Sequence, residues 1–275
     1  MNTSTMQQKA NEIRQDIIRS IYEAGSGHPG GSLSCADILT VLYFHEMNID
    51  PENPEKEDRD RFVLSKGHCA PAYYATLANR GYFEKEELWK LRKMGAMLQG
   101  HPDMKHTPGV DMSTGSLGQG VSAACGMAYA LKQKKSSARV YCLLGDGEIQ
   151  EGQVWEAAMF AAAKQLDNLV LMIDNNNLQI DGTIEEVNSP YPIDQKFASF
   201  NFHVENVEDG HDINQLLSAF NKVKKSERPA VIIAKTIKGK GVSFMENQAG
   251  WHGKAPNIAQ KQQALQELNE RMTTL

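Results

Sequence analysis

Apolar and polar positions alternate along the chain in blocks that predict strands and helices in turn. Two short apolar runs, Val140–Leu144 and Leu169–Ile173, each stop at a loop rich in glycine or asparagine. Between them, Val154–Leu166 is rich in alanine, phenylalanine and methionine and contains neither glycine nor proline, which predicts a buried helix. Apolar strands joined by a helix are typical of a parallel pair covered on both faces, so both strands are expected to end at the same edge of the sheet.

The same alternation continues through the rest of the chain. It predicts a doubly wound α/β fold with a mostly parallel sheet and helices on both faces. Further strands are expected at 62–64, 202–207 and 230–235, and further helices at 8–24, 34–47, 71–80, 85–94, 121–132, 213–225 and 257–272. Asp212 is expected to cap its helix, and Gly25–Gly31 is expected to be irregular. No linker-like stretch divides the chain, so residues 1–275 are expected to form one domain.

Polar residues follow the two central strands where each strand ends. Asp146 lies between two glycines after the first strand, and Asn176 lies in an Asn-rich loop after the second. Because parallel strands end at one edge, these side chains are expected to lie side by side. Carboxylate and amide oxygens suit Mg²⁺ or Ca²⁺, the glycines permit close backbone approach, and the next helix points its N-terminus at the same place. The pair indicates a site for a metal-bridged diphosphate, whereas Asp146 alone would be better explained by a tight turn that it caps.

Composition and charge exclude several classes of protein. The formal net charge of −5, without an arginine-rich run, argues against nucleic-acid binding as the main role. The N-terminus is polar and no apolar run approaches the roughly 20 residues that span a bilayer, so no membrane association is expected. The four cysteines show no paired spacing, which favours buried free thiols in a reducing compartment. A cytoplasmic, globular protein is expected.

Four of the eight histidines lie in glycine-rich loops: His28, His68, His101 and His252. None has zinc-like spacing to another histidine or cysteine, so a zinc site is not expected. Imidazoles in such loops can donate to phosphate or hydroxyl oxygens and move protons near neutral pH. Each is also explained by a loop histidine that backbone carbonyls satisfy. The role of His211 is left open, and the remaining histidines are expected to be structural.

These motifs, taken in order, resemble the diphosphate-binding half of transketolase over nearly the whole chain. The segments that carry the resemblance are Ser26–Ser34, Asp50–His68, Gln99–Asp103, Thr114–Gly120, Gly145–Ala157, Asp174–Gly182 and Trp251–Pro256. The resemblance implies that the cofactor is thiamine diphosphate, held through Mg²⁺ or in its place Ca²⁺ or Mn²⁺. It also implies the protein ligands of that metal, which are Asp146, Asn176 and the backbone carbonyl of Leu178.

Further residues are assigned by the same resemblance. The residues matched to cofactor contacts are Gly147 at the diphosphate, Ile180 as an apolar contact, and Gly115, Ser116 and Leu117 at the aminopyrimidine, with Ser116 where the family often has proline. His68 and His252 match histidines near the diphosphate and substrate hydroxyls, and His28 and His101 match histidines that orient the donor sugar and assist proton transfer. Glu151, also assigned to the cofactor site, and Glu156 match a subunit contact between active sites, although both could be exposed acids in the first helical turn. Two interpretations stay open for Lys238 and Lys240: they bind phosphate, or they belong to a solvated basic turn.

Whole transketolases continue with a pyrimidine-binding domain and a third domain, and this chain stops at Leu275. It is therefore expected to be the N-terminal subunit of a split transketolase that moves a two-carbon ketol unit from a ketose phosphate to an aldose phosphate. A partner subunit with the pyrimidine-binding domain would supply the glutamate that activates thiamine, in an α2β2 heterotetramer. Three alternatives stay open: a split enzyme for a branched or modified sugar phosphate, a relative that forms deoxyxylulose phosphate, and a non-catalytic or regulatory subunit.

Overall fold

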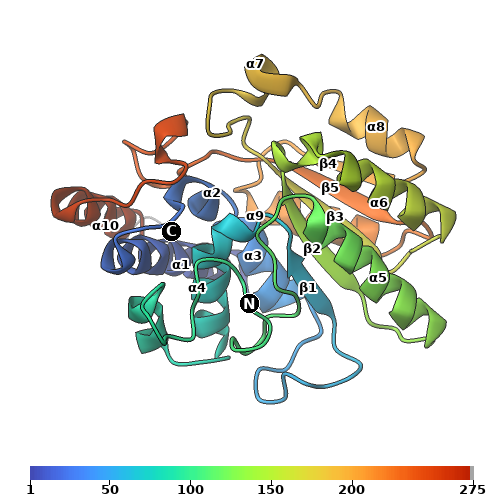
Figure 1. Ribbon diagram of the computed structural model, residues 1–275, viewed down its shortest axis with the longest axis horizontal. Coiled ribbons are helices and arrows are strands. Elements are labelled where there is room, and N and C mark those ends of the chain that lie inside the picture. The colour runs from blue at the N-terminus through green and yellow to red at the C-terminus, as the bar shows by residue number, and fades with distance from the viewer. Residues whose placement is uncertain (273–275) are drawn as a thin grey trace.

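A computed structural model describes residues 1–272, and its core is a single five-stranded sheet (Figure 1). The strands are β1 (Arg61–Leu64), β2 (Val140–Gly145), β3 (Leu169–Asn175), β4 (His203–Val207) and β5 (Ala230–Lys235). Their order in space is β1-β2-β3-β5-β4, and every neighbouring pair is parallel. The carboxyl ends of all five strands therefore lie at one edge of the sheet.

Helices cover both faces of this sheet. They are α1 (Thr3–Ala24), α2 (Pro29–Ser34), α3 (Ala36–Val41), α4 (Ala70–Arg80), α5 (Gln119–Gln133), α6 (Gly152–Ala163), α7 (Ile184–Asn188), α8 (Ile193–Ser199), α9 (Ile213–Val223) and α10 (Ile258–Met272). Alternate residues of β2 enter different cores: Tyr141 and Leu143 pack with the helices α1, α3, α4 and α9, and Cys142 packs with α5, α6 and α8. This two-sided burial confirms the expected fold class.

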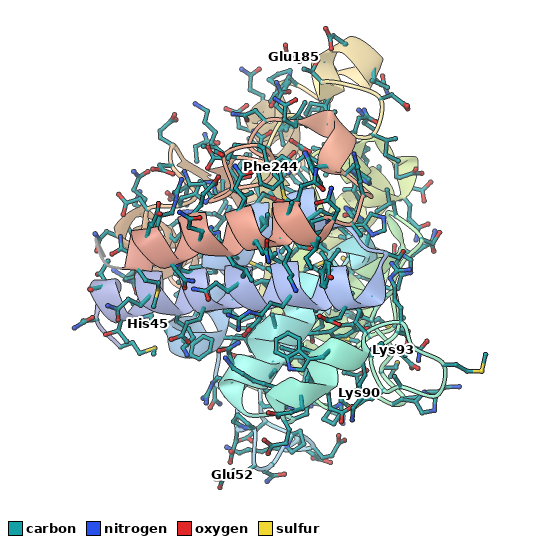
Figure 2. All side chains as sticks on the ribbon, turned by 90° about the vertical axis from the view of Figure 1, so that its left-hand side faces the viewer. His45, Glu52, Lys90, Lys93, Glu185 and Phe244 are labelled. Atoms are coloured by element: carbon teal, nitrogen blue, oxygen red, sulfur yellow. The ribbon has the colours of Figure 1, made fainter. Side chains whose placement is uncertain are left out.

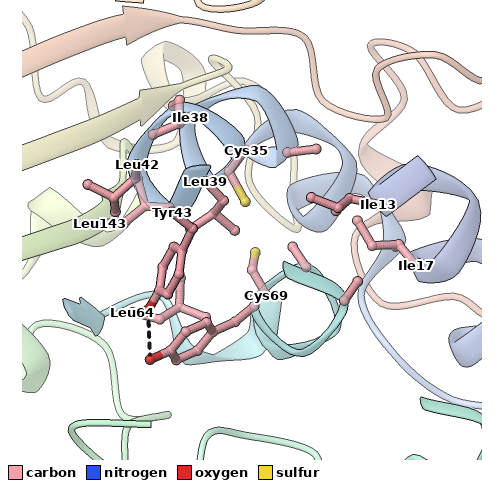
Figure 3. Packing of buried hydrophobic residues seen from close by; sticks show 14 of the residues in the cluster. Ile13, Ile17, Cys35, Ile38, Leu39, Leu42, Tyr43, Leu64, Cys69 and Leu143 are labelled. Atoms are coloured by element: carbon pink, nitrogen blue, oxygen red, sulfur yellow. Dashed lines mark hydrogen bonds between the residues drawn. The ribbon is translucent and has the colours of Figure 1, made fainter. Parts of the chain in front are cut away.

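The N-terminal helices differ from the prediction. Helix α2 begins at Pro29 inside the segment that was expected to be irregular, and the single helix expected at 34–47 is broken at Cys35 and ends in a π-helical turn, Leu42–Glu46. Proline at a first helical turn needs no N–H partner, so it starts a helix as readily as it ends one. A Cβ on Gly30 would lie 3.0 Å from the Trp251 carbonyl oxygen, so this glycine permits close packing. Figure 3 shows the resulting core, where Cys35 and Leu39 face Leu64 and Cys69.

Other differences are smaller. The helix expected at 85–94 is a 3₁₀ segment, Lys85–Lys90, and the two short helices α7 and α8 were not expected. Asp174 and Asn175 belong to β3, not to the loop after it. Asp212 caps α9 as expected, its side chain accepting a hydrogen bond from the N–H of Asn214.

Two expectations from composition agree with the structure. All four cysteines, Cys35, Cys69, Cys125 and Cys142, are free and buried. Across residues 1–272, no helix is both long and apolar enough to cross a bilayer.

A buried polar network links helices α1 and α3 to the loops that follow β4 and β5. The guanidinium of Arg14 on α1 bonds both carboxylate oxygens of Asp37 on α3, and His211 Nδ1 lies 2.7 Å from Asp37 Oδ2. The other ring nitrogen, Nε2, accepts from the N–H of Ile237 at 2.8 Å. Because Nε2 is the acceptor, the ring hydrogen sits on Nδ1 and is donated to Asp37. His211, left open above, is thus a structural link between three segments.

We predict that Asp37 makes the free energy of unfolding depend on pH in the acid range. Burial would raise its pKa, but Arg14 and His211 outweigh burial and lower the pKa to about 2. A carboxyl group with a depressed pKa stabilises the fold above its unfolded value near 4 and loses that contribution as pH falls towards 2. Asp37→Asn should therefore cost about 2 kcal/mol at pH 6, and roughly half of this difference should be gone by pH 3.

Urea unfolding of wild type and variant between pH 6 and pH 3 measures this difference. The control is Asp58→Asn, because the Asp58 side chain is 64% exposed and its removal should cost little at any pH. A cost of Asp37→Asn that does not change with pH would contradict the assignment.

Candidate active site

A pocket of about 250 Å³ lies at the carboxyl ends of β2 and β3. The expected residues that line it are His68, Gly115, Leu117, Asp146, Gly147, Asn176, Leu178, Ile180 and His252. Gly145 and Asp174 are register partners at the ends of the two strands, and the N–H of Asp146 donates to the Asp174 carbonyl at 3.3 Å. The strand pairing therefore brings Asp146 and Asn176 to one place, as the sequence predicted.

Asp146 is a buried carboxylate without a cationic partner. Its side chain accepts hydrogen bonds from the backbone N–H of Gly147 at 2.8 Å and of Asn177 at 2.5 Å, and the residue is 2% exposed. No lysine, arginine or histidine within residues 1–272 forms an ion pair with it. Burial, and then the charge of Asp174, raise its pKa to about 7. A bound cation would offset this cost, so the carboxylate fits a metal ligand.

Asn176 presents an oxygen to the same pocket. Its Nδ2 donates to Ser34 Oγ at 3.3 Å and to Asp174 Oδ2 at 3.4 Å, while its Oδ1 accepts from the Leu178 N–H at 3.1 Å and keeps a second lone pair for a ligand. The carbonyl of Leu178 adds a third oxygen and accepts from Lys238 Nζ at 3.1 Å. One carboxylate, one amide and one carbonyl form a hard oxygen set that suits Mg²⁺. In the described residues no cluster of three histidine, cysteine or acidic side chains is placed to hold a metal.

Lys238 is not part of a solvated turn, so that alternative is wrong for this residue. It is 2% exposed, lines the pocket, and its Nζ lies 3.0 Å from His252 Nδ1. Burial lowers its pKa to about 8, so the ammonium form predominates at neutral pH. A buried ammonium group beside a set of oxygen ligands is suited to bind an anionic group such as a phosphate.

Three of the four loop histidines pack together at the wall of the pocket. The rings of His68 and His252 stack with centroids 5.1 Å apart, and His28 meets them edge-on at 5.3 and 5.5 Å. Burial, and then His68, lower the pKa of His28 to about 4. Burial, and then Lys238, lower the pKa of His252 to about 3. Both rings are neutral at pH 7, and His28 Nδ1 is a buried atom without a partner in the described chain.

His101 stands slightly apart from this cluster. Its ring packs against Gly115, where an added Cβ would lie 3.1 Å from the imidazole. Gly115 has φ +155°, so a side chain here would be strained and would press on the ring, and a Cβ on Gly67 would lie 2.7 Å from the Gly115 nitrogen. Burial, and then the charge of Arg92, lower the pKa of His101. This histidine therefore lies beside the pocket wall and does not line it.

The remaining expected residues lie at the rim or outside. Leu117 and Ile180 line the pocket while 38% and 66% exposed, so two apolar side chains stand open at its mouth. Ser116 and Glu151 do not line it. Glu151 is the N-terminal flanking residue of α6 and Glu156 follows within that helix, and both are exposed.

Residues 5–270 match the family described as transketolase, thiamine diphosphate binding domain. The chain belongs to the transketolase family. Curated relatives include the 6-deoxy-6-sulfo-D-fructose transketolase subunit of Clostridium sp. (strain MSTE9), 48% identical over 90% of both chains, and an apulose-4-phosphate transketolase subunit of Phocaeicola vulgatus, 40% identical over 100% of this chain and 98% of that protein. These findings confirm the resemblance seen in the sequence.

Solved transketolases share the fold. The enzyme from Campylobacter jejuni superposes with a TM-score of 0.88 at 33% identity, and one from Pichia stipitis with 0.92 at 31%. This chain is covered by 100% and 98%, but it spans only 48% and 41% of those two chains. The similarity therefore concerns the diphosphate-binding part of longer transketolases.

In this transketolase domain, the sequence did not reveal a buried ion pair beside the candidate metal ligands, which also lines the pocket. Asp174, 0% exposed, accepts from Lys66 Nζ, Ser34 Oγ and Thr236 Oγ1. Lys66, 2% exposed, also donates to the Gly31 carbonyl at 3.1 Å. The only sign of this ion pair in the sequence is a lysine shortly after a predicted strand. A lysine at that position is equally typical of a solvated loop.

Glu148 was missed as well. Its Oε1 accepts from the Ser65 hydroxyl at 2.5 Å and from the Gly118 N–H at 3.0 Å, and its Oε2 accepts from the Gly145 N–H at 3.0 Å. One carboxylate thus joins the loops after β1 and β2 to the glycine-rich turn before α5. Burial raises its pKa, while these hydrogen bonds act in the opposite direction.

We predict that Lys66→Met destabilises the fold by about 3–5 kcal/mol, because it leaves Asp174 charged and buried without a cation. The second substitution Asp174→Asn should recover part of this loss. Urea unfolding measures both, with Lys93→Met as the control, since Lys93 is exposed (Figure 2). A cost below about 1 kcal/mol for Lys66→Met would show that Asp174 does not depend on this lysine.

Proposed function

We propose that the chain is the N-terminal, cofactor-binding subunit of a split transketolase. The observation that carries the proposal is one pocket that combines the oxygens of Asp146, Asn176 and Leu178 with a buried lysine and two stacked histidines, His68 and His252. A scaffold or regulatory subunit needs none of these groups, which is why we favour a catalytic subunit. We further propose that residues 1–275 form one domain, that the protein is cytoplasmic and that it serves the pentose phosphate pathway.

Thiamine diphosphate, when bound, supplies the reactive carbon that carries a two-carbon ketol unit from a ketose phosphate to an aldose phosphate. Asp146, Asn176 and Leu178 would hold Mg²⁺ at its diphosphate. Lys238 adds a positive charge next to them, and Gly147 exposes its backbone at the same wall. Leu117 and Ile180 offer apolar surface at the mouth of the pocket for the rings of the cofactor.

The histidines would orient the sugar. Lys238 Nζ donates to His252 Nδ1, so the ring hydrogen of His252 sits on Nε2 and can be donated to a substrate oxygen. His28 is neutral and has a buried Nδ1 without a partner in the described residues, which suits a hydrogen bond to a hydroxyl group. Neutral imidazoles can both donate and accept, so they can hold a hydroxyl as charge changes on it and assist its proton transfer. His68 and His101 extend this wall.

We propose that a partner subunit with the pyrimidine-binding domain completes the site in an α2β2 heterotetramer. Support comes from the relatives named as transketolase subunits, which this chain matches over 90% and 98% of their length. It comes also from an exposed apolar patch on α5 and α6, which we define as Tyr129, Met159 and Phe160. The rings of Tyr129 and Phe160 lie 6.0 Å apart on helices that form an outer layer of the molecule (Figure 1). Glu151 and Glu156 lie along α6 and would belong to the same contact.

A second candidate is the same chemistry with a modified donor. The relative at 48% identity is named for 6-deoxy-6-sulfo-D-fructose, and the one at 40% for apulose 4-phosphate. This chain covers both relatives nearly end to end. Their names favour a donor ketose other than the common sugar phosphates. The pocket of this chain is compatible with both candidates, because its groups face the cofactor and the sugar hydroxyls.

We predict that Asp146→Asn abolishes Mg²⁺-dependent binding of thiamine diphosphate while the fold survives. The substitution removes the only carboxylate of the oxygen set, and it also removes a buried charge with a raised pKa, so unfolding stability at pH 8 should not fall. Calorimetric titration with thiamine diphosphate, with and without Mg²⁺, measures the binding. The matched control is Asp181→Asn, on an exposed residue of the neighbouring loop. Unchanged tight binding by Asp146→Asn would place the cofactor elsewhere.

We predict that the chain alone transfers no ketol units and gains this activity when co-expressed with its pyrimidine-domain partner. Phe160→Glu should prevent co-purification because it places a charge in the apolar patch. Ile258→Glu, on a more exposed apolar residue of α10, should have no effect. The reconstituted enzyme is assayed with ketose phosphates and with the sulfonated ketose as donors, which separates the two candidates. Full activity of the chain alone would refute the need for a partner.

A further inference from the structure

A second cavity, of about 220 Å³, lies away from the cofactor pocket. Its walls come from α1, α3, α10 and the loops that follow β4 and β5. Figure 2 shows α1 and α10 lying side by side. The residues that matter for its chemistry are Gln7, Arg14, Asp37, Lys240, Gly241 and Arg271. Nothing in the proposed function uses this cavity.

Among residues 1–272, the ion pairs around the cavity leave one positively charged side chain, Lys240, without an acidic partner. Arg14 faces Asp37, and the Arg271 guanidinium lies 3.7 Å from Glu246. Lys240 forms no ion pair with any acid of the described chain. His211 also borders the cavity, but its Nε2 accepts a hydrogen bond from the N–H of Ile237 and therefore offers no donor to a ligand. A ligand that balances the charge of Lys240 is an anion.

Hydrogen-bond donors are also left over. Arg14 is 6% exposed and spends its two terminal nitrogens on Asp37, while its Nε has no partner in residues 1–272. A buried donor without an acceptor costs free energy, and an oxygen atom of a ligand would remove that cost. Gln7, which is half-buried on α1, forms no side-chain hydrogen bond with the described residues. Its amide is thus available at the rim.

The backbone shape keeps the cavity open. Gly241 has φ +96°, and a Cβ built on it would lie 2.9 Å from Leu268 Cδ2 and 3.3 Å from Arg14 Cδ. A side chain at this position would therefore push into the wall where Arg14 lies. Lys238 and Lys240 stand on either side of Gly239 in one loop, with Lys238 in the cofactor pocket and Lys240 in this cavity. The two pockets share that loop.

We propose that this cavity is a binding site for a small tetrahedral oxyanion, a phosphate group, held by Lys240, Arg14 Nε and the Gln7 amide. The volume accommodates a phosphate with a short polyol but not a nucleotide. Inorganic phosphate and a phosphate ester share this chemistry, so both serve as probes. The proposal does not depend on which sugar the enzyme uses.

The test is calorimetric titration of the full chain with inorganic phosphate and, separately, with glycerol 3-phosphate. Gln7→Glu keeps the size of the side chain and adds a negative charge at the rim, which should raise the phosphate Kd by about tenfold. Lys240→Ala should weaken binding by a similar factor. The matched control is Gln8→Glu, the same charge change on the same helix at a residue that does not line the cavity, and it should bind like wild type. Tighter binding of glycerol 3-phosphate than of phosphate would identify the ester as the ligand.

Three outcomes overturn the proposal. One is no binding by the wild-type chain at about 10 mM phosphate. Another is an equal effect of Gln7→Glu and Gln8→Glu, which would reflect net charge alone. The last is binding that Lys238→Met abolishes and Gln7→Glu leaves unchanged, which would place the phosphate in the cofactor pocket. Matching unfolding curves for the two glutamate variants and wild type exclude a loss of fold as the cause.

Discussion

The arrangement of the segments around the pocket depends on the buried carboxylate of Asp174. It stands at the end of the central strand β3 and receives hydrogen bonds from Lys66, Ser34 and Thr236. These donors come from the loop after β1, from α2 and from the loop after β5. A charge at 0% exposure is tolerable only when a cation and several donors surround it, so all three segments are fixed together or not at all.

The cofactor pocket is a consequence of that arrangement. Asn176 donates to both Ser34 and Asp174, so the network that neutralises Asp174 also turns the Asn176 oxygen towards the pocket. Lys66 bonds the Gly31 carbonyl and so holds α2, which follows His28, against the site. Glu148 plays the same part for the turn that carries Gly115 and Leu117, because it bonds the Gly118 N–H. The residues expected to contact a ligand are thus oriented by the charges of Asp174, Lys66 and Glu148, which line the same pocket.

The strands, the two-sided sheet and the pair Asp146–Asn176 could be predicted because each follows from local pattern and from the geometry of parallel strands. Lys66, Glu148 and Lys238 could not be assigned by pattern, since a charged residue after a strand looks the same in sequence whether it is buried or solvated. Burial depends on segments distant in the chain: Lys238 meets Leu178 and His252 across 60 and 14 residues. Helix α2 was missed for a related reason, because glycines that weaken an isolated helix here permit contact with the loop around Trp251. The resemblance named the contact residues but not this supporting frame.

Asp146 and Asp174 differ in how the protein compensates their charge. Both are buried carboxylates at the ends of neighbouring strands, and the charge of Asp174 helps to raise the pKa of Asp146. Asp174 is compensated by Lys66 inside the protein, whereas Asp146 has only two backbone N–H groups and a pKa raised to about 7. A second lysine paired with Asp146 would stabilise the fold, but the carboxylate oxygen would then no longer be available to bind a metal. This difference in compensation separates the structural role of Asp174 from the metal-binding role that we propose for Asp146.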